Sequence, residues 1–290
     1  MPELPEVEHI ARGLHERLPG RTVRGVTVRW ERCLAAHTPQ ALEQAIVGLT
    51  FQSVSRRAKF LLLELPPYWL IVHLRMTGRL FFCETPQPEW ETHPHVHVVL
   101  ELDGDARLYY RDVRKFGRLY LTRAPQEIVG GLGAEPLAPD FTAERLGDIL
   151  RGRRRQLKPL LLDQRALAGL GNIYVDEALW LAGLHPLVRS DSLSDKDVAR
   201  LHASIRQVLH AALAHGGTTL RDYRGPDGQT GTHQHALAVY GRAQTPCLRC
   251  GAPIRRIVVG QRGTHYCPAC QPAPPTLEEM SDDDLAARSP

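Results

Sequence analysis

The sequence predicts an α+β protein of two domains, in which a long N-terminal helix and an antiparallel β-sandwich precede a helical domain and a cysteine-rich β-hairpin. Three observations carry this prediction. The chain has 290 residues, which exceeds the length at which a single hydrophobic core usually stops growing. Short strand-like runs dominate residues 22–122, and helical periodicity replaces them from residue 142. Two closely spaced pairs of cysteines then follow near the end.

The chain begins with MPELPEVE, which places two prolines and three glutamates within eight residues. Apolar residues recur at helical spacing from residue 7 to residue 18, and Pro19-Gly20 ends the run. This pattern predicts an amphipathic helix from residue 5 to about residue 18. Pro5 suits a first helical turn, and Glu6 and Glu8 would lie at the positive end of the helix dipole. Taken by itself, the stretch is interpreted as a helix entrance.

Strands follow the first helix. Residues 22–30 alternate apolar and polar side chains, and Thr38-Pro39 opens a short capped helix. Further strand-like runs read KFLLLEL, WLIVHL, RLFFC, VHVVLEL, RLYYRDV and GRLYLT. Asp103-Gly104 suits a hairpin turn between the fourth and the fifth of these runs. Because no long helix separates them, the strands predict an antiparallel sandwich.

Changes in composition divide the chain further. Residues 1–123 form the expected β-sandwich domain, and the Gly- and Pro-rich residues 124–140 form an expected linker. Residues 141–240 are expected to be mainly helical, and residues 241–271 hold the cysteine module. The acidic, proline-containing residues 272–290 have the composition of a disordered tail.

Cys247, Cys250, Cys267 and Cys270 form two CxxC pairs that are separated by sixteen residues. This is the spacing of a four-thiolate zinc site, in which the residues between the pairs fold as a hairpin. Two disulfides are the alternative, which a reducing cytosol disfavours. Because four protein ligands close the coordination sphere, we expect one Zn²⁺ with a structural role.

The charge of the chain favours an anionic partner. The formal net charge is +4, and the last twenty residues hold five acidic side chains and one arginine, so residues 1–270 carry 35 basic and 27 acidic groups. Most of the basic residues are arginine, which fits bidentate phosphate contacts and equally an arginine-rich genome. No apolar run approaches the roughly 20 residues of a membrane span, and the acidic N-terminus is unlike a signal peptide. A soluble, cytoplasmic protein is therefore expected.

Two further positions could hold an anion. Two glycines precede Asn172 at a predicted helix start, where exposed backbone N–H groups can bind phosphate. An ordinary N-cap formed by Asn172 is the alternative there. Arg262 lies between Gly260 and Gly263, where the cysteine hairpin would turn back, and it could hold a phosphate or be a solvated loop residue.

Eight segments in order along the chain carry a family resemblance. They are MPELPEVE, RRAKFLLLEL, HLRMTGRL, DVRKFGRLYL, LGNIYVDEAL, GGTTLRDY, VYGR and the terminal cysteine module. Together they resemble bacterial formamidopyrimidine-DNA glycosylases from residue 1 to about residue 271, and chance agreement of so many motifs is not credible. The resemblance implies a helix-two-turn-helix element in the helical domain, a lesion-covering loop from Tyr223 to His235, and a zinc-finger hairpin.

The resemblance implies a bifunctional DNA glycosylase and AP lyase of base excision repair, which removes oxidised purines such as 8-oxoguanine and formamidopyrimidines. Family members lose the initiator methionine, and the nitrogen of Pro2 attacks the sugar carbon that carries the damaged base. An α-amino group has a reference pKa of roughly 8, so a useful fraction is neutral near pH 7 and can form a Schiff base. Glu3 is implied in proton transfer, Glu6 in support of the site, and Lys59 in the β,δ-elimination. Arg262 completes the implied catalytic set as a clamp on the DNA backbone.

The same comparison implies contacts to damaged double-stranded DNA from six side chains: Met76, His93, Arg114, Phe116, Arg153 and Asn172. Met76, Arg114 and Phe116 match a wedge that fills the space left by the flipped nucleotide, with Arg114 facing the orphaned cytosine. Asn172 matches a second backbone clamp, and His93 and Arg153 align with further DNA contacts. A monomeric protein that associates with the nucleoid through DNA is expected.

Two alternatives remain at this point. The paralogue endonuclease VIII prefers oxidised pyrimidines, and the LPEVE start and the Met-Arg-Phe wedge argue against it. The other alternative is a noncatalytic zinc-ribbon DNA-binding protein, and intact Pro2, Glu3 and Lys59 argue against that. His233 stands where phenylalanine is frequent in the family, which leaves the base preference open.

Overall fold

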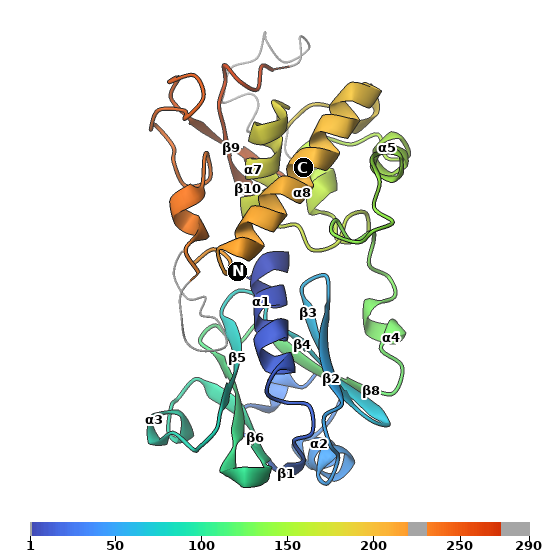
Figure 1. Cartoon of the computed structure of the whole chain (residues 1–290), viewed down its shortest axis with the longest axis vertical. Coiled ribbons are helices and arrows are strands. Elements are labelled where there is room, and N and C mark those ends of the chain that lie inside the picture. The colour runs from blue at the N-terminus through green and yellow to red at the C-terminus, as the bar shows by residue number, and fades with distance from the viewer. Residues whose placement is uncertain (1, 220–230, 274–290) are drawn as a thin grey trace. The chain divides into compact units, whose positions relative to one another are not determined.

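The computed structural model describes residues 2–219 and 231–273 (Figure 1). The chain divides into two compact units, of which the first comprises Met1–Gly131 and Ala212–Gln234, and the second comprises Leu132–Ala211 and His235–Pro290. The end of the helix Asp195–Ala214 and the segment after it therefore belong to the N-terminal unit. Within the described residues, none of the helices combines the length and the apolar character that a membrane span requires.

Helix α1 (Leu4–His15) opens the first unit. Glu3 is its N-cap, and a capping box joins Glu3 and Glu6, which satisfies two of the backbone N–H groups that a helix start leaves unpaired. The helix ends at His15, earlier than the predicted residue 18, because the chain tightens into a turn there. Leu18 is nevertheless buried. The predicted amphipathic helix is confirmed with a shorter C-terminal end.

Two four-stranded antiparallel sheets form the sandwich of the first unit, with strand orders β1-β6-β7-β5 and β2-β3-β4-β8. Their bounds are β1 (Val23–Val28), β2 (Ser53–Arg57), β3 (Phe60–Leu65), β4 (Tyr68–His73), β5 (Gly78–Cys83), β6 (Val96–Leu102), β7 (Arg107–Asp112) and β8 (Arg118–Thr122). Helix α1 contacts β2 of one sheet and β5 of the other, and its buried side chains join the common core (Figure 1). The predicted antiparallel sandwich is confirmed.

Short helices connect these strands, namely η1 (Glu31–Cys33), α2 (Pro39–Ile46), α3 (Pro88–Glu91) and η2 (Asp103–Asp105), and α4 (Gln126–Val129) follows the last strand. Thr38 caps α2, because its Oγ1 accepts the Ala41 amide over 3.2 Å. Strand β2 was not predicted. Its sequence SVSRR buries only Val54 fully, so it lacks an apolar alternation. Helix α4 lies within residues 124–140.

The second unit is built mainly from helices. The remaining helices are α5 (Ala143–Arg151), α6 (Leu157–Leu162), α7 (Asn172–Ala182), η3 (Ser190–Ser192), α8 (Asp195–Ala214) and η4 (His233–Ala236). Helix α7 is buried along most of its length and contacts α6 and β10. Gly216 and Gly217 follow α8 with φ values of 66° and 87°, which are left-handed conformations that end a helix readily.

A two-stranded hairpin carries the last part of the second unit. Strands β9 (Arg255–Val259) and β10 (Arg262–Tyr266) pair antiparallel, with Arg262 opposite Val259. Gly260 and Gln261 form the turn with φ values of 52° and 60°, the signs that a two-residue type I′ turn requires. The predicted hairpin between the cysteine pairs is therefore present, and the α+β fold class is confirmed.

Candidate active site and zinc centre

Residues 2–7 are buried in the first unit. Pro2 is buried, and Glu3 and Glu6 are 2% and 1% exposed. The Glu3 amide donates a hydrogen bond to Glu6 Oε2 over 2.7 Å. Because the residue next to Pro2 is fixed in this way, Pro2 has a defined position at the start of α1. A nitrogen beside two ordered carboxylates can act as a nucleophile with proton transfer close at hand.

A remote segment of the same unit also holds Glu6. The Thr218 amide donates to Glu6 Oε1 over 2.7 Å, so both carboxylate oxygens accept backbone hydrogen bonds. A Cβ on Gly217 would lie 2.9 Å from Glu6 Oε1, and the φ of Gly217 is 87°, so glycine is needed for this approach. This contact was not predicted, although the double glycine of GGTTLRDY is a signal for it. Most of the predicted lesion-covering loop, residues 223–230, lies outside the described residues.

Lys59 directly precedes β3 in the first unit. It is 7% exposed and follows Ala58, which has a φ of 52° in the turn from β2, so a fully solvated lysine is excluded. His73 pairs with Phe60 in the neighbouring strand, and their ring centres are 4.5 Å apart. Burial, followed by the charges of Arg75 and Lys59, lowers the pKa of His73 to about 3. The surroundings are cationic and suit a phosphate group.

Met76, Arg114 and Phe116 are brought together in the first unit. Arg114 Nη1 lies 3.1 Å from Met76 Sδ, and the guanidinium carbon lies 4.7 Å from the centre of the Phe116 ring. Met76 is 42% exposed and Phe116 is 48% exposed. An exposed cluster of large apolar side chains with one cation is suited to contact with another molecule.

Two further predicted DNA contacts, His93 and Arg153, belong to different units. His93 borders a pocket of about 370 Å³ in the first unit, together with Arg29 and Lys115. Its ring centre lies 5.3 Å from that of Trp90, and burial lowers the pKa of His93. Arg153 is exposed on the second unit, between α5 and α6. Both residues have basic neighbours, which suits an anionic ligand.

In the second unit, Asn172 is the first residue of α7. Gly171 is the N-cap, so the alternative that Asn172 caps the helix is wrong. The Asn172 Nδ2 group donates to the Gly263 carbonyl over 2.8 Å, and Lys158 Nζ lies 3.3 Å from the same oxygen. Asn172 Oδ1 is buried and has no hydrogen-bond partner among the described residues. Two side chains therefore fix the hairpin next to Arg262.

A buried ion pair supports this arrangement. Lys158 Nζ lies 2.6 Å from Asp176 Oδ1, and both side chains are 0% exposed. Asp176 Oδ2 also accepts the His265 amide over 2.9 Å. The neighbouring Glu177 accepts the backbone amides of residues 238–240 over 2.8–2.9 Å. Neither acid could be recognised from the sequence as a buried group, because spacing does not reveal which charges become buried.

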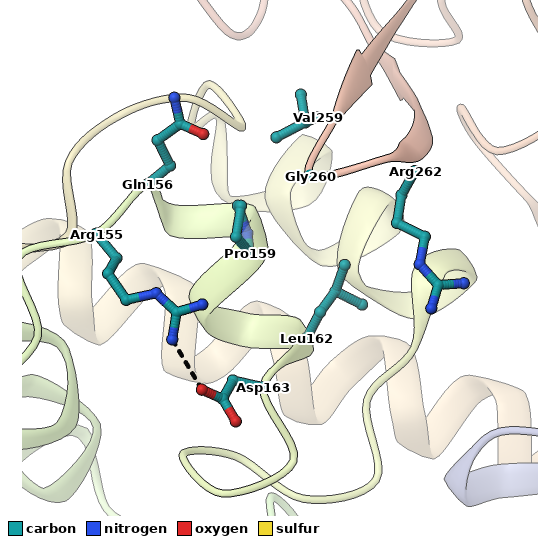
Figure 2. Close-up of a pocket in the computed structure, with 8 residues that line it drawn as sticks. All are labelled: Arg155, Gln156, Pro159, Leu162, Asp163, Val259, Gly260 and Arg262. Carbon is teal, nitrogen blue, oxygen red and sulfur yellow. Dashed lines mark hydrogen bonds and ion pairs between the residues drawn. The ribbon is translucent and has the colours of Figure 1, made fainter. Parts of the chain in front are cut away.

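Arg262 borders a pocket of about 500 Å³ in the second unit (Figure 2). Its lining comes from α6, the preceding loop and the hairpin turn, and consists of Arg155, Gln156, Pro159, Leu162, Asp163, Val259, Gly260 and Arg262. Arg155 Nη1 pairs with Asp163 Oδ2 over 2.8 Å, and Figure 2 shows Arg262 extending from the end of the hairpin, apart from that pair. An exposed guanidinium on a rigid hairpin is well suited to hold a phosphate.

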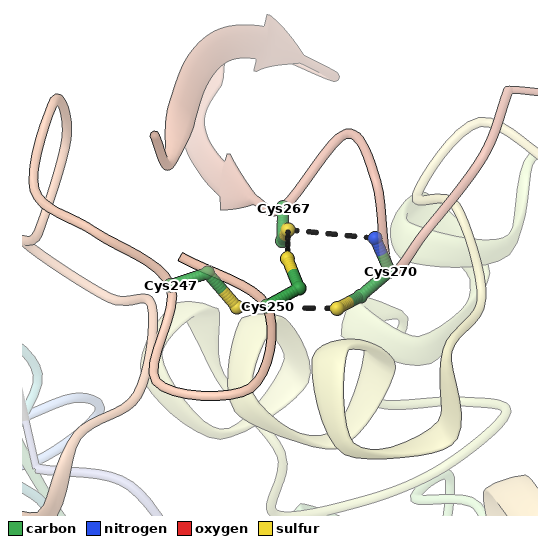
Figure 3. Close-up of side chains that lie close together, drawn as sticks. All are labelled: Cys247, Cys250, Cys267 and Cys270. Carbon is green, nitrogen blue, oxygen red and sulfur yellow. Dashed lines mark hydrogen bonds between the residues drawn. The ribbon is translucent and has the colours of Figure 1, made fainter. Parts of the chain in front are cut away.

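The four cysteines of the second unit converge from two loops (Figure 3). Their sulfur atoms all lie within 4.8 Å of one another, and all four thiols are free of disulfide bonds. Zinc–sulfur bonds of about 2.3 Å in a tetrahedron place sulfur atoms roughly 3.8 Å apart. The Cys250–Cys267 and Cys247–Cys270 separations are 3.4 and 3.9 Å, so the donor set fits Zn²⁺.

The surroundings of Cys247 favour a metal-binding thiolate. Burial of this thiol opposes its ionisation, but hydrogen bonds outweigh burial and lower its pKa to about 6. The donors are the Arg249 amide and the Trp180 indole, each 3.4 Å from the sulfur. The protein therefore stabilises a thiolate at Cys247, whereas burial and the neighbouring thiols raise the pKa of Cys267 and of Cys270.

Three family models match the chain. Residues 1–119 match the formamidopyrimidine-DNA glycosylase N-terminal domain, residues 132–224 match the H2TH domain of the same enzymes, and residues 245–273 match the zinc finger found in FPG and IleRS. The sandwich with its N-terminal proline, the helical part and the four-cysteine hairpin thus define one class of DNA glycosylase.

Related proteins match the sequence over nearly the whole chain. A formamidopyrimidine-DNA glycosylase from Roseiflexus sp. is 47% identical, and the match covers 93% of this chain and 100% of that protein. One from Bacillus subtilis is 42% identical and covers 93% of this chain and 99% of that protein. The chain belongs to the formamidopyrimidine-DNA glycosylase family.

Solved structures show the same fold. A Lactococcus lactis FPG mutant in complex with Fapy-dG-containing DNA has a TM-score of 0.87 at 38% identity. The match covers 94% of this chain and 100% of the Lactococcus lactis chain. A complex of Lactococcus lactis Fpg with abasic-site DNA has a TM-score of 0.86 at 38% identity. That match covers 93% of this chain and 100% of the Lactococcus lactis chain. The resemblance found in the sequence is confirmed.

Proposed function

We propose that this chain is a bifunctional enzyme that excises oxidised purines from double-stranded DNA and then cleaves the backbone as an AP lyase. The glycosylase activity follows from the family, since the relatives carry that name and related structures hold Fapy-dG DNA. The lyase step and the residue roles go further and are supported by the chemistry of the described side chains. The observation that carries them is the ordered cluster of Pro2, Glu3 and Glu6.

Pro2 is the proposed nucleophile. Removal of Met1 exposes a secondary amine, whose neutral form attacks the sugar carbon that bears the damaged base. A carbon–nitrogen bond forms, and the base leaves with the electron pair of the glycosidic bond and takes up a proton. The nitrogen loses its proton, and its lone pair then breaks the bond between the sugar carbon and the ring oxygen. The ring opens, the oxygen takes up a proton, and the nitrogen becomes an iminium. The iminium acidifies the adjacent sugar proton, whose loss expels one phosphate by β-elimination, and δ-elimination then expels the other.

The neighbouring side chains divide the remaining tasks. Glu3 transfers protons at the base or at the sugar ring, and Glu6 orients Glu3 through the 2.7 Å hydrogen bond to its amide. Lys59 lies near the lesion phosphates and assists the eliminations. Arg262 grips the backbone from the hairpin, where the contacts to Gly263 hold it in place.

DNA binding involves both units. Met76, Arg114 and Phe116 form the wedge that replaces the flipped nucleotide in the stack, and filling that space offsets an unstacking cost of about a few kcal/mol. Asn172 positions the backbone clamp, and His93 and Arg153 add contacts to the DNA. The basic body of the chain attracts the duplex at long range.

We also propose one structural Zn²⁺ per chain. Four cysteine thiolates would hold it and leave no open coordination position, so the ion supplies rigidity to the hairpin that carries Arg262. The chain works as a cytoplasmic monomer that associates with the nucleoid. Its domains are the sandwich (1–123), a linker (124–140), the helical domain (141–240), the zinc finger (241–271) and an acidic tail (272–290).

Borohydride trapping tests the proposed reaction. The purified chain is incubated with duplexes that contain 8-oxoguanine opposite cytosine, thymine glycol, or no lesion, and borohydride reduces any iminium to a stable amine. We expect a covalent protein–DNA adduct on the 8-oxoguanine duplex. A preference for thymine glycol would instead indicate an endonuclease VIII-like enzyme. Absence of an adduct on every duplex would refute the enzyme proposal and favour a DNA-binding zinc ribbon.

Metal analysis tests the zinc centre. We expect about one zinc per chain, and Cys250→Ser should lower both zinc content and DNA affinity, the latter by about tenfold or more, because the hairpin loses its support. Cys83→Ser in the first unit is the matched control and should retain zinc. A metal-free chain with full DNA affinity would contradict a structural zinc.

A further inference from the structure

Two histidines face each other where the chain crosses itself after α8. The Nδ1 atoms of His215 and His233 are 3.0 Å apart, and the ring centres are 5.3 Å apart. His215 is exposed directly after α8, whereas His233 is 5% exposed at the start of η4. The reaction proposed above assigns no role to either side chain.

The backbone at this crossing is tightly joined. The Thr232 amide donates to the His215 carbonyl over 2.9 Å, and the His233 amide donates to the Gly217 carbonyl over 3.2 Å. A Cβ on Gly231 would lie 2.1 Å from the Gly217 oxygen, so the two segments can approach this closely only because residue 231 is glycine.

We define residues 215–217 and 231–233 as the clasp. One end of the clasp continues directly into Thr218, whose amide donates to Glu6 Oε1 over 2.7 Å. Glu6 Oε2 in turn accepts the Glu3 amide over 2.7 Å, beside the proposed nucleophile. A continuous series of hydrogen bonds therefore connects the clasp with the start of the chain.

We propose that His215 and His233 are positioning residues for base excision. Their Nδ1–Nδ1 hydrogen bond keeps the clasp closed and thereby holds the Thr218 amide on Glu6. Neither histidine needs to touch the DNA for this role. The inference rests on the proposed function, because it matters for activity only if the cluster around Glu6 carries the chemistry.

The hydrogen bond between the rings requires a particular protonation state. One Nδ1 must carry a proton and the other must offer its lone pair, whereas two fully protonated rings would present two N–H groups and two positive charges to each other. Burial, followed by the charge of His215, lowers the pKa of His233 to about 4. An exposed, protonated His215 can still donate to a neutral His233, so the clasp tolerates one charge but not two.

The lowered pKa of His233 sets the direction of the pH dependence. An opened clasp binds a proton with the ordinary histidine pKa of roughly 6.5, so the closed clasp has its full stability above that pH and loses it as the pH falls towards about 4. Two other titratable groups face the clasp. His9 Nε2 would lie 3.9 Å from a Cβ on Gly216, and Glu6 lies beside Gly217.

Four variants separate the hydrogen bond from general packing. His233→Leu removes the ring nitrogen, whereas His233→Asn keeps a polar group at the δ position. His215→Leu changes the exposed partner, where folding is not at risk. His210→Leu on α8 is the matched control at another exposed histidine. Each variant is assayed for single-turnover excision of 8-oxoguanine and for hydrogen–deuterium exchange of the amides of residues 216–219.

We expect both leucine substitutions in the clasp to slow excision by about tenfold or more and to speed amide exchange at residues 216–219. His233→Asn should stay within about threefold of the parent rate, and His210→Leu should be unchanged. The pH profile gives an independent readout. Because asparagine does not titrate, His233→Asn should show less loss of activity than the parent between about pH 6.5 and pH 4.

Unchanged exchange at residues 216–219 in both leucine variants would overturn the proposal, as would equal impairment by His233→Leu and His233→Asn. The exchange measurement does not depend on catalysis. If the parent chain neither excises 8-oxoguanine nor forms a borohydride adduct, the proposed function fails, and the positioning role fails with it. The exchange comparison still decides in that case whether the histidine pair closes the clasp.

Discussion

Chains that retain Met1 should form at least about a hundredfold less borohydride adduct on the 8-oxoguanine duplex than chains from which Met1 has been removed. Retention of Met1 turns the nitrogen of Pro2 into an amide, whose lone pair is delocalised into the carbonyl and cannot form an iminium. The intact mass of each preparation establishes the state of Met1, and a denaturing gel measures the adduct. A full yield of adduct with Met1 retained would exclude Pro2 as the nucleophile and favour a lysine such as Lys59.

Pro2→Gly tests the ring of the same residue. A terminal glycine keeps an amine but lacks the pyrrolidine ring, which is buried and fixes the approach of the nitrogen beside Glu3, so we expect the adduct to be lost. Pro19→Gly is the matched control, since Pro19 is exposed in the turn after α1 and should give the parent yield.

Lys158→Met should lower the free energy of unfolding of the second unit by about 3–5 kcal/mol. The substitution removes a cation from a pair with both side chains 0% exposed and leaves the Asp176 carboxylate buried without its 2.6 Å partner. Loss of one partner is costly even where the pair itself contributes little, because the remaining charge stays out of water. Urea titration followed by a signal from the second unit measures the change.

Two controls accompany that measurement. Arg151→Met breaks the exposed pair with Asp195, whose side chains are 48% and 96% exposed, and should cost less than about 1 kcal/mol. Replacing Lys158 by Met and Asp176 by Leu together should recover part of the loss, although the His265 amide then lacks its acceptor. If Lys158→Met alone lowered the free energy of unfolding as little as Arg151→Met does, the buried ion pair would be contradicted.

Local pattern predicted most of the elements, because helices, turns and strands depend on neighbours within a few residues. The spacing of apolar residues was sufficient for α1, and the two CxxC pairs were sufficient for the hairpin and the four converging sulfur atoms. Strand β2 was missed because SVSRR gains its place in the sheet from pairing with β3 rather than from an apolar alternation.

Motifs predicted the roles of the site residues, whereas the fold determines their burial and their hydrogen-bond partners. The family motif implied a role for Lys59, whereas its burial was decided by the fold. Spacing left two interpretations of Asn172, a phosphate-binding helix start and an ordinary N-cap. Gly171 takes the N-cap position, and the Asn172 amide contacts the hairpin instead. Neither outcome could be derived locally, since burial depends on which elements pack together.

The carboxylate of Glu6 makes one contact that the sequence determines and one that only the tertiary structure determines. Its position three residues after Glu3, at the start of a helix, is a sequence feature, and it was enough to determine the hydrogen bond that the Glu3 amide donates to Oε2. The bond from Oε1 to the Thr218 amide joins residues that are 212 positions apart. That contact exists only because the segment after α8 returns to the N-terminal unit, where the packing of the whole unit offsets the entropy of closing so long a loop.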